Sequence, residues 1–106
     1  MQLDTNIAVA PEQIEAFCQR WKITELSFFG SILRDDFRPD SDVDVLVTFS
    51  PEADWSLFDH LGMEEEFSTI LHRNIDLVSR RAIERSTNWI RRREILGSAE
   101  PYYVAR

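Results

Sequence analysis

The chain has 106 residues, of which 43% are hydrophobic, and a net charge of −7. These values suit one small domain with a single core and exclude a chain that is disordered by composition. The only cysteine, Cys18, excludes an intramolecular disulfide framework. No apolar run approaches the ~20 residues of a membrane span, and no signal segment opens the chain, so we expect a cytoplasmic protein without membrane contact.

Charge is distributed unevenly along the chain. Residues 1–70 carry a net charge of −11, whereas residues 71–106 carry +4 because of eight arginines. An acidic bulk argues against stable binding of nucleic acid, which needs a basic face to neutralise phosphates. The arginines are expected to pair with the domain's own acids or with solvent, and an acidic partner is the alternative.

The first part of the chain predicts a loose arm followed by a helix. Residues 1–10 show no periodicity and form the expected arm. A helix is predicted over residues 11–21, because apolar residues recur at i, i+3, i+4 and i+7. These residues are Ile14, Phe17, Cys18 and Trp21. Cys18 on this face is interpreted as a small buried hydrophobic residue and not as a nucleophile.

Two strands with a short helix between them come next. Residues 24–29 are rich in apolar and aromatic residues and predict the first strand. A short helix is expected over 31–35 and a turn over 38–41, where proline, aspartate and serine gather. The second strand is predicted over 42–49, and its apolar run indicates a central, covered position.

The second half adds one strand and further helices. A long helix is expected over 55–71, with an apolar stripe that includes Phe58 and Leu61 and with three glutamates facing water. A short strand is predicted over 75–78, a helical turn over 82–85 and a helix over 89–97 capped by Asn88. Residues 98–106 are expected to form a C-terminal tail.

This order of elements predicts a single α/β (α+β) domain over residues 1–106. We expect a short mixed sheet of about three to four strands flanked by helices. The sequence shows no internal repeat and no segment of low complexity.

Three aspartates carry the predicted chemistry. Asp42 and Asp44 lie two residues apart at the start of a strand, so their side chains share one face. Two such close carboxylates repel each other unless a cation joins them, and hard oxygen ligands suit Mg²⁺ or Mn²⁺. Asp76, in the strand predicted over 75–78, is the candidate third ligand of a site for two ions.

Gly30 and Ser31 are the candidate phosphate-binding residues. Glycine allows the backbone to approach an anion closely, and the start of a helix offers free N–H groups. Arg34, one turn later, can reach the same phosphates. Neither Asp-x-Asp nor Gly-Ser is specific alone, but their order, strand, Gly-Ser, helix, turn, Asp-x-Asp, strand, favours a site for a nucleoside triphosphate.

These residues resemble the signature of the polymerase-β-type nucleotidyltransferase superfamily, and its minimal nucleotidyltransferase (MNT) branch most closely. The matching residues are Gly30, Ser31, Arg34, Arg38, Pro39, Ser41, Asp42 and Asp44. The segment 75–78, Ile-Asp-Leu-Val, resembles the strand that carries the family's third carboxylate. The resemblance covers about residues 11–103.

The resemblance implies a nucleotidyltransferase, in particular a protein adenylyltransferase, with ATP as substrate and two Mg²⁺ or Mn²⁺ ions as cofactors. It also implies a type VII-like antitoxin that transfers AMP to a hydroxyl, expected to be a tyrosine, of a HEPN ribonuclease toxin. Catalytic and metal roles would then fall on Asp42, Asp44 and Asp76, and nucleotide binding on Gly30, Ser31 and Arg34. A homo- or hetero-oligomer is compatible with this role.

Two alternatives remain at the level of the sequence. One is an antitoxin that neutralises its toxin by binding alone, which is favoured by Asp35 where the family often has glycine and by Ile32 where it often has arginine. The other is a nucleotidyltransferase that acts on a small molecule or on RNA.

Aromatic residues and arginines outside the motif have simpler interpretations. Trp21, Trp55 and Trp89 are expected to be core or interface anchors and not base-stacking platforms. The run Arg91–Arg93 spreads over ~200° of a helix, so at least one of the three faces solvent or a partner. Tyr102 and Tyr103 are candidate partner contacts or modification sites.

Overall fold

The computed structural model describes residues 11–33 and 41–105. In the first half the elements are α1 (Pro11–Arg20), β1 (Ile23–Phe29), the 3₁₀ turn η1 (Gly30–Leu33) and β2 (Val43–Phe49). In the second half they are α2 (Leu57–Leu71), β3 (Ile75–Ser79), α3 (Arg80–Glu84), α4 (Trp89–Ser98) and β4 (Glu100–Val104). None of the helices in these residues is long and apolar enough to cross a membrane.

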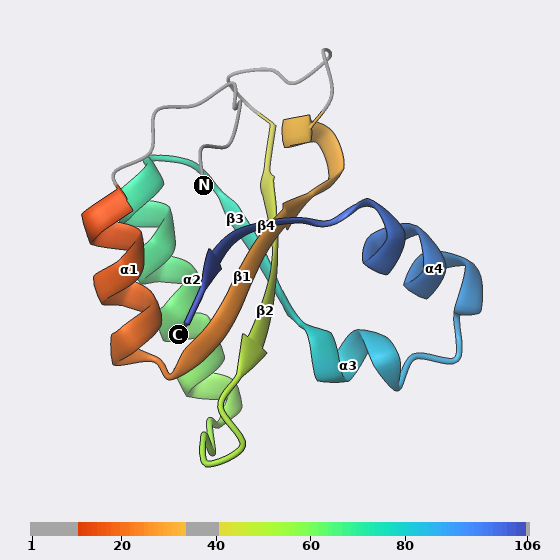
Figure 1. Cartoon of the computed structure of the whole chain (residues 1–106). Helices are drawn as coiled ribbons and strands as arrows, with labels where there is room; N and C mark the ends of the chain where they lie inside the picture. Colours follow the sequence, from red (N-terminus) through yellow and green to blue (C-terminus); the bar gives the residue numbers. More distant parts are fainter. Residues whose placement is uncertain (1–10, 34–40, 106) are drawn as a thin grey trace.

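The four strands form one mixed sheet in the order β3-β2-β1-β4 (Figure 1). β1 runs antiparallel to both of its neighbours, β2 and β4, whereas β2 and β3 are parallel and are joined through α2. The predicted fold class, a small mixed sheet flanked by helices, is confirmed. The central position predicted for the second strand is also confirmed, because β2 lies between β1 and β3.

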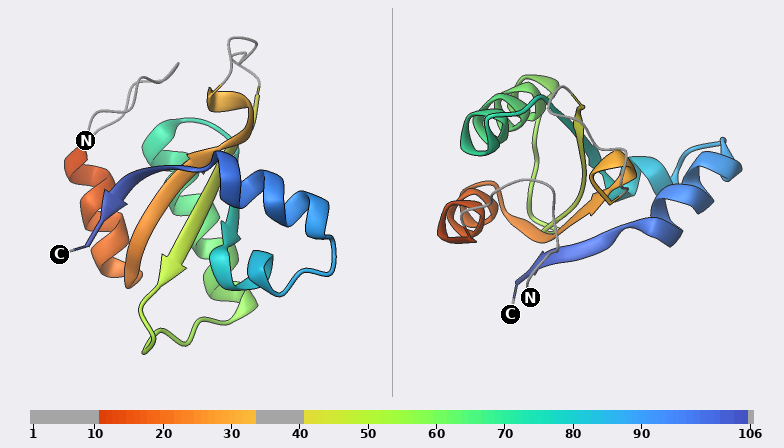
Figure 2. Two further views of the ribbon diagram at one scale, coloured as in Figure 1. Left: turned by 45° about the vertical axis from the view of Figure 1, so that its right-hand side comes forward. Right: turned by 90° about the horizontal axis from the view of Figure 1, so that it is seen from above.

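Helices α1 and α2 lie together on one face of the sheet, and α3 and α4 lie on the other side (Figure 2). Under α1 and α2 is the larger core, in which the rings of Phe17 and Phe67 stack with centroids 4.7 Å apart. Val43, Val45 and Val47 of β2 point into this core and are fully buried. Because side chains alternate along a strand, the residues of β2 between these valines point to the opposite face of the sheet.

The opposite face of the sheet carries a smaller core beneath α3 and α4. It consists of Phe29, Leu46, Ile83 and Ile95, all buried. Leu46 alternates with the valines of β2, so Asp44, two residues before it, lies on this same face. The fold thus buries one side of β2 completely and leaves the aspartates on the side that α4 only partly covers.

The segment expected to be a C-terminal tail contains the fourth strand, β4, which the sequence interpretation missed. Tyr102 explains its position, because its ring meets that of Phe28 edge-on with centroids 5.7 Å apart. Pro101 is compatible with a strand at the edge of a sheet, where one side of the backbone needs no partner. Tyr102 and Tyr103 pack against the larger core and are half-buried.

The prediction of which α2 residues form its buried apolar stripe is partly wrong. Phe58 and Leu61 are 86% and 53% exposed, whereas Met63, Phe67 and Leu71 are the buried residues of this helix. The glutamates do not all face water, since Glu64 accepts the Leu77 N–H at 2.9 Å and Glu66 accepts Trp21 Nε1–H at 3.1 Å. The α2 helix is therefore oriented so that Glu64 contacts β3 and Glu66 contacts Trp21, just after α1, whereas Glu65 is exposed.

Residues interpreted as structural are confirmed in α1 and around it. Cys18 is fully buried, and this burial raises the pKa of its thiol to about 12, so the thiol is not a nucleophile at neutral pH. Trp21 and Trp55 meet edge-on at 5.2 Å, and Trp55 Nε1 donates to the Trp21 carbonyl at 2.9 Å. These two tryptophans anchor the loop before α2 to the end of α1.

The two phenylalanines of α2 provide a matched test of this packing. Phe67→Ala removes a fully buried ring and should lower the free energy of unfolding by about 3–5 kcal/mol. Phe58→Ala removes an exposed ring and should change it by no more than about 0.5 kcal/mol. Urea titrations followed by circular dichroism measure both values, and equal losses would contradict the orientation of α2.

Candidate active site

The site begins with two aspartates that lie opposite each other in the sheet. In the parallel pairing of β2 and β3, Asp44 is aligned with Asp76, and Val43 with Ile75. Aligned residues of neighbouring strands point to the same face, so both carboxylates lie on the side of the sheet that faces α4. Asp44 is partly buried and Asp76 is exposed.

Asp42 lies immediately before β2 and is exposed. Its neighbours are held by the segment that leads into β3. The Arg73 guanidinium donates to the Ser41 carbonyl at 3.2 Å, and the Val43 N–H donates to the Asn74 carbonyl at 2.9 Å. The backbone on both sides of Asp42 is therefore tied to the start of the strand that carries Asp76.

Gly30 lies against the carboxylate of Asp44 at the end of β1. Its φ is +78°, a conformation that disfavours residues with a Cβ atom. A Cβ at this position would overlap Oδ2 of Asp44 and lie 3.1 Å from its Cγ. The glycine predicted to approach a phosphate thus also leaves the space that the Asp44 carboxylate occupies.

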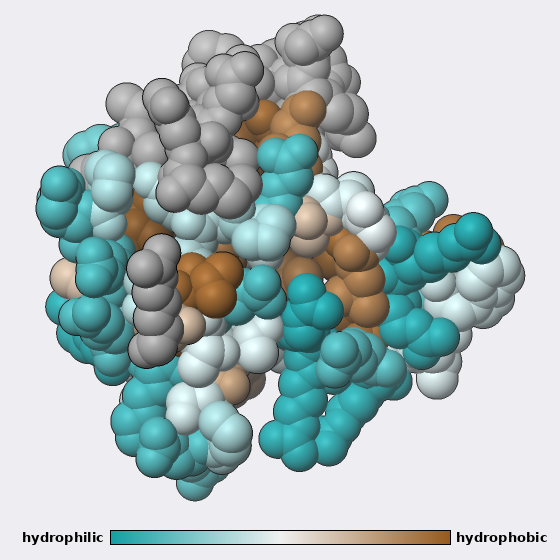
Figure 3. All heavy atoms as spheres, in the orientation of Figure 1, coloured by the Kyte–Doolittle hydropathy of each residue, from teal (hydrophilic) through white to brown (hydrophobic). Residues whose placement is uncertain are grey.

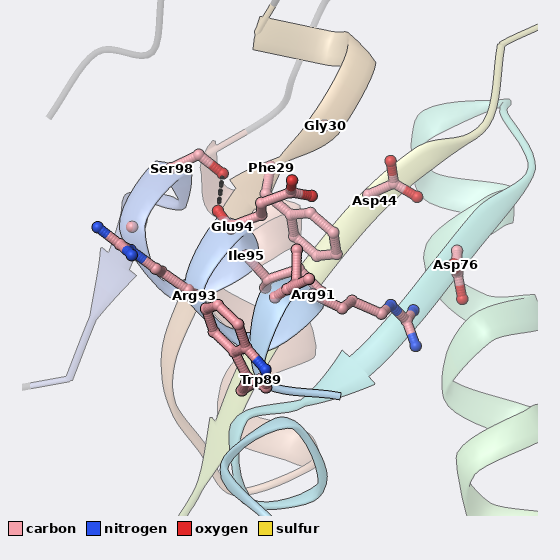
Figure 4. Close-up of a pocket in the computed structure, with 12 residues that line it drawn as sticks. Phe29, Gly30, Asp44, Asp76, Trp89, Arg91, Arg93, Glu94, Ile95 and Ser98 are labelled. Carbon is pink, nitrogen blue, oxygen red and sulfur yellow. Dashed lines mark hydrogen bonds between the residues drawn. The ribbon is translucent and has the colours of Figure 1, made fainter. Parts of the chain in front are cut away.

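A cleft of about 1170 Å³ has one wall formed by Gly30, Asp44 and Asp76. α4 forms the opposite wall, and Figure 4 shows its side chains across from Asp44 and Asp76. In Figure 3, hydrophobic atoms reach the surface where α4 meets the sheet, with hydrophilic side chains around them. The lining residues come from β1, β2, β3 and α4 and are Phe29, Gly30, Asp44, Asp76, Trp89, Ile90, Arg91, Arg93, Glu94, Ile95, Gly97 and Ser98.

A cap starts α4, and a buried residue docks it over the sheet. Asn88 caps the helix, its side chain accepting the Arg91 N–H at 3.1 Å, as the sequence predicts. Ile95, 6% exposed, packs into the smaller core beside Phe29. The helix thus begins at a cap and is buried near its C-terminal end, whereas its first turn is exposed at the edge of the cleft.

Only two of the three predicted metal ligands line the cleft. The structure pairs Asp44 with Asp76, whereas Asp42 is outside the lining of the cleft. Among residues 11–33 and 41–105, no group of three or more acidic, His or Cys side chains that could hold a metal ion is found. The donors still fit a hard divalent cation, because Asp44 and Asp76 present carboxylate oxygens to the cleft from the same face of the sheet.

The predicted phosphate-binding residues are only partly described. Gly30 and Ser31 open η1, directly after β1, in the predicted order of strand, Gly-Ser and helical turn. Arg34 lies outside the described residues.

Sequence reasoning missed the contribution of α4 to the cleft. Trp89, expected to be a core or interface anchor, is 58% exposed and lines the cleft together with Arg91. In the sequence, this helix is marked by an aromatic residue followed by a run of arginines. Nothing in the sequence, however, placed this helix opposite Asp44, because that contact depends on the tertiary position of α4.

Comparison with known proteins identifies the family. Residues 10–100 match the family described as Nucleotidyltransferase domain. The chain belongs to this family. Its motif residues Gly30, Asp44 and Asp76 all lie within the matched range, and they are the ones that the fold places at the cleft. The family expected from the sequence is thereby confirmed.

Similar proteins agree with this assignment. The protein adenylyltransferase MntA of Thermococcus cleftensis is 35% identical over 66 residues, which are 62% of this chain and 65% of that protein. The chain therefore aligns with less than two thirds of the length of this relative. A solved structure assigned to the minimal nucleotidyltransferases is 29% identical, with a TM-score of 0.66 and coverage of 87% of this chain and 88% of that one.

A third similarity concerns the fold alone, because only 15% of the residues are identical. The solved structure is that of a tri-AMPylated HEPN toxin of Shewanella oneidensis in complex with an MNT antitoxin. The TM-score is 0.62, and the match covers 90% of this chain and 70% of that one.

Two glycines test the close approach of Gly30 to Asp44. Gly30→Ala should lower the free energy of unfolding by about 1–3 kcal/mol, because the new methyl group meets Asp44 and the positive φ is strained. Gly97→Ala lies in α4 with no atom within 4 Å of the added Cβ and should raise stability by up to about 1 kcal/mol. Opposite signs in thermal or urea unfolding are expected, and a neutral Gly30→Ala would contradict the packing.

Proposed function

We propose that this protein is a metal-dependent nucleotidyltransferase that acts as an antitoxin. It transfers AMP from ATP to a tyrosine hydroxyl of a partner HEPN ribonuclease toxin. The observation that carries the proposal is the pairing of Asp44 with Asp76 in a cleft beside Gly30. Like charges aligned across a ladder destabilise a sheet, so their presence favours a role in chemistry over a role in folding.

Similar proteins support two parts of the proposal, the adenylyl transfer and the HEPN partner. The relative from Thermococcus cleftensis is named a protein adenylyltransferase. The Shewanella oneidensis complex contains a HEPN toxin that carries AMP groups and an MNT antitoxin with the same fold as this chain. A protein substrate with a modified hydroxyl therefore suits this chain better than RNA or a small molecule.

The residues available for metal ions are Asp42, Asp44 and Asp76. When bound, two Mg²⁺ or Mn²⁺ ions would neutralise the triphosphate and the charge that develops in the transition state. Asp44 and Asp76 are the pair that β2 and β3 hold in register, and Asp42 lies two residues before Asp44. The hydrogen bonds at Ser41 and Val43 keep Asp42 next to the start of β3.

The reaction also needs residues that bind ATP and a base that takes the proton of the acceptor hydroxyl. The acceptor oxygen attacks the α-phosphorus of ATP, the bond from that phosphorus to the bridging oxygen breaks, and pyrophosphate leaves. Asp76, the exposed member of the pair, accepts the proton of the attacking hydroxyl and can pass it to solvent. Gly30 and Ser31, at the start of η1, receive the phosphates with the help of Arg34.

Mass spectrometry of the HEPN partner tests this function. After incubation with the full chain, ATP and Mg²⁺, the partner should gain the mass of one AMP group for each modified tyrosine. Asp44→Asn and Asp76→Asn should each lower the rate of modification at least about 100-fold, because each removes a charge that stabilises the transition state. Asp54→Asn, which removes an exposed carboxylate outside the cleft, should leave the rate unchanged.

Folding of the variants is checked by circular dichroism. Replacing either carboxylate by its amide leaves the side-chain size unchanged, so the variants should fold. A partner that is neutralised without any gain in mass, equally by the unchanged chain and by Asp44→Asn, would replace this proposal with an antitoxin that acts by binding alone.

A further inference from the structure

The three consecutive arginines of α4 have different surroundings. The Arg92 guanidinium donates to the carbonyls of Glu84 at 3.5 Å and Ser86 at 3.1 Å, which satisfies backbone groups at the end of α3. Arg91 and Arg93 instead line the cleft. Their side chains form no hydrogen bond or ion pair with residues 11–33 or 41–105.

Arg91 and Arg93 extend in different directions. Figure 4 shows Arg91 reaching toward the part of the cleft where Asp44 and Asp76 lie, whereas Arg93 extends away from them. Arg91 therefore places a permanent positive charge near the two carboxylates, from the opposite wall. A charge at that position suits an anion that lies between the wall and the aspartates.

Trp89 lies two residues before Arg91, in the first turn of α4, and also lines the cleft. Its side chain is 58% exposed, in contrast to the half-buried Trp21 and Trp55. Its indole takes part in no ring contact among the described residues. An exposed aromatic surface beside a cation is the combination that binds a nucleobase and its phosphates together.

We infer that the first turn of α4 is part of the binding site for the donor nucleotide: Arg91 binds the phosphate chain and Trp89 packs against the base. This inference rests on the proposed function and adds two residues to the nucleotide-binding set. Arg91 supplies from α4 a positive charge on the wall opposite Asp44 and Asp76. The donor, and not the acceptor, carries the negative charge that Arg91 would attract.

Binding measurements without any partner test this inference. Isothermal titration calorimetry with Mg²⁺ uses two probes, an ATP analogue with a methylene group between the α- and β-phosphates, and inorganic tripolyphosphate. Arg91→Gln should weaken both probes about tenfold or more, because it removes a charge-assisted contact to phosphate. Trp89→Leu should weaken the ATP analogue about fivefold or more and leave tripolyphosphate unchanged, since only the analogue has a base.

Arg93→Gln is the matched control, because it removes the same charge from the same helix on a side chain that extends away from the aspartates. It should change both affinities less than about twofold. Equal losses in Arg91→Gln and Arg93→Gln, or no loss in Arg91→Gln and Trp89→Leu, would overturn the inference while the function stands. Failure of the unchanged chain to bind the ATP analogue would overturn both the inference and the proposed function.

Discussion

The parallel pairing of β2 with β3 sets Asp44 opposite Asp76, and the other features of the site depend on this alignment. Two carboxylates on adjacent strands repel each other, so the sheet must be stabilised elsewhere. The stabilising contacts lie on the other face, where Val43, Val45 and Val47 are fully buried under α1 and α2. β2 thus contributes both to the site and to the core, because its alternate residues point to opposite faces of the sheet.

The helices on the two faces have different roles. α2 joins β2 to β3 and also contacts the edge of the sheet, where Glu64 accepts the N–H of Leu77, the residue after Asp76. This contact satisfies a backbone group that an edge strand would otherwise expose to solvent. α4 packs on the smaller core through Ile95 and is tied to the end of α3 by Arg92, and it covers this core without closing the cleft.

Local patterns in the sequence predicted most of the framework. Apolar spacing located α1, an apolar run located β2, and Asn88 marked the start of α4, because caps and apolar patterns depend on neighbours in the chain. The same patterns did not predict features that depend on contacts between residues far apart in the sequence. β4 is a strand because Tyr102 packs against Phe28. Glu64 and Glu66 of α2 turn inward because the Leu77 N–H and Trp21 offer them hydrogen bonds.

By itself, the sequence determined the candidate chemistry, since the side-chain types and the spacing of two between Asp42 and Asp44 are local properties of the chain. Only the tertiary structure decided which groups share a cleft. It aligned Asp76 with Asp44 through strand register, placed Gly30 against that carboxylate, and brought Trp89 and Arg91 to the opposite wall. Register and helix docking depend on packing between residues that are far apart in sequence, and no local pattern encodes them.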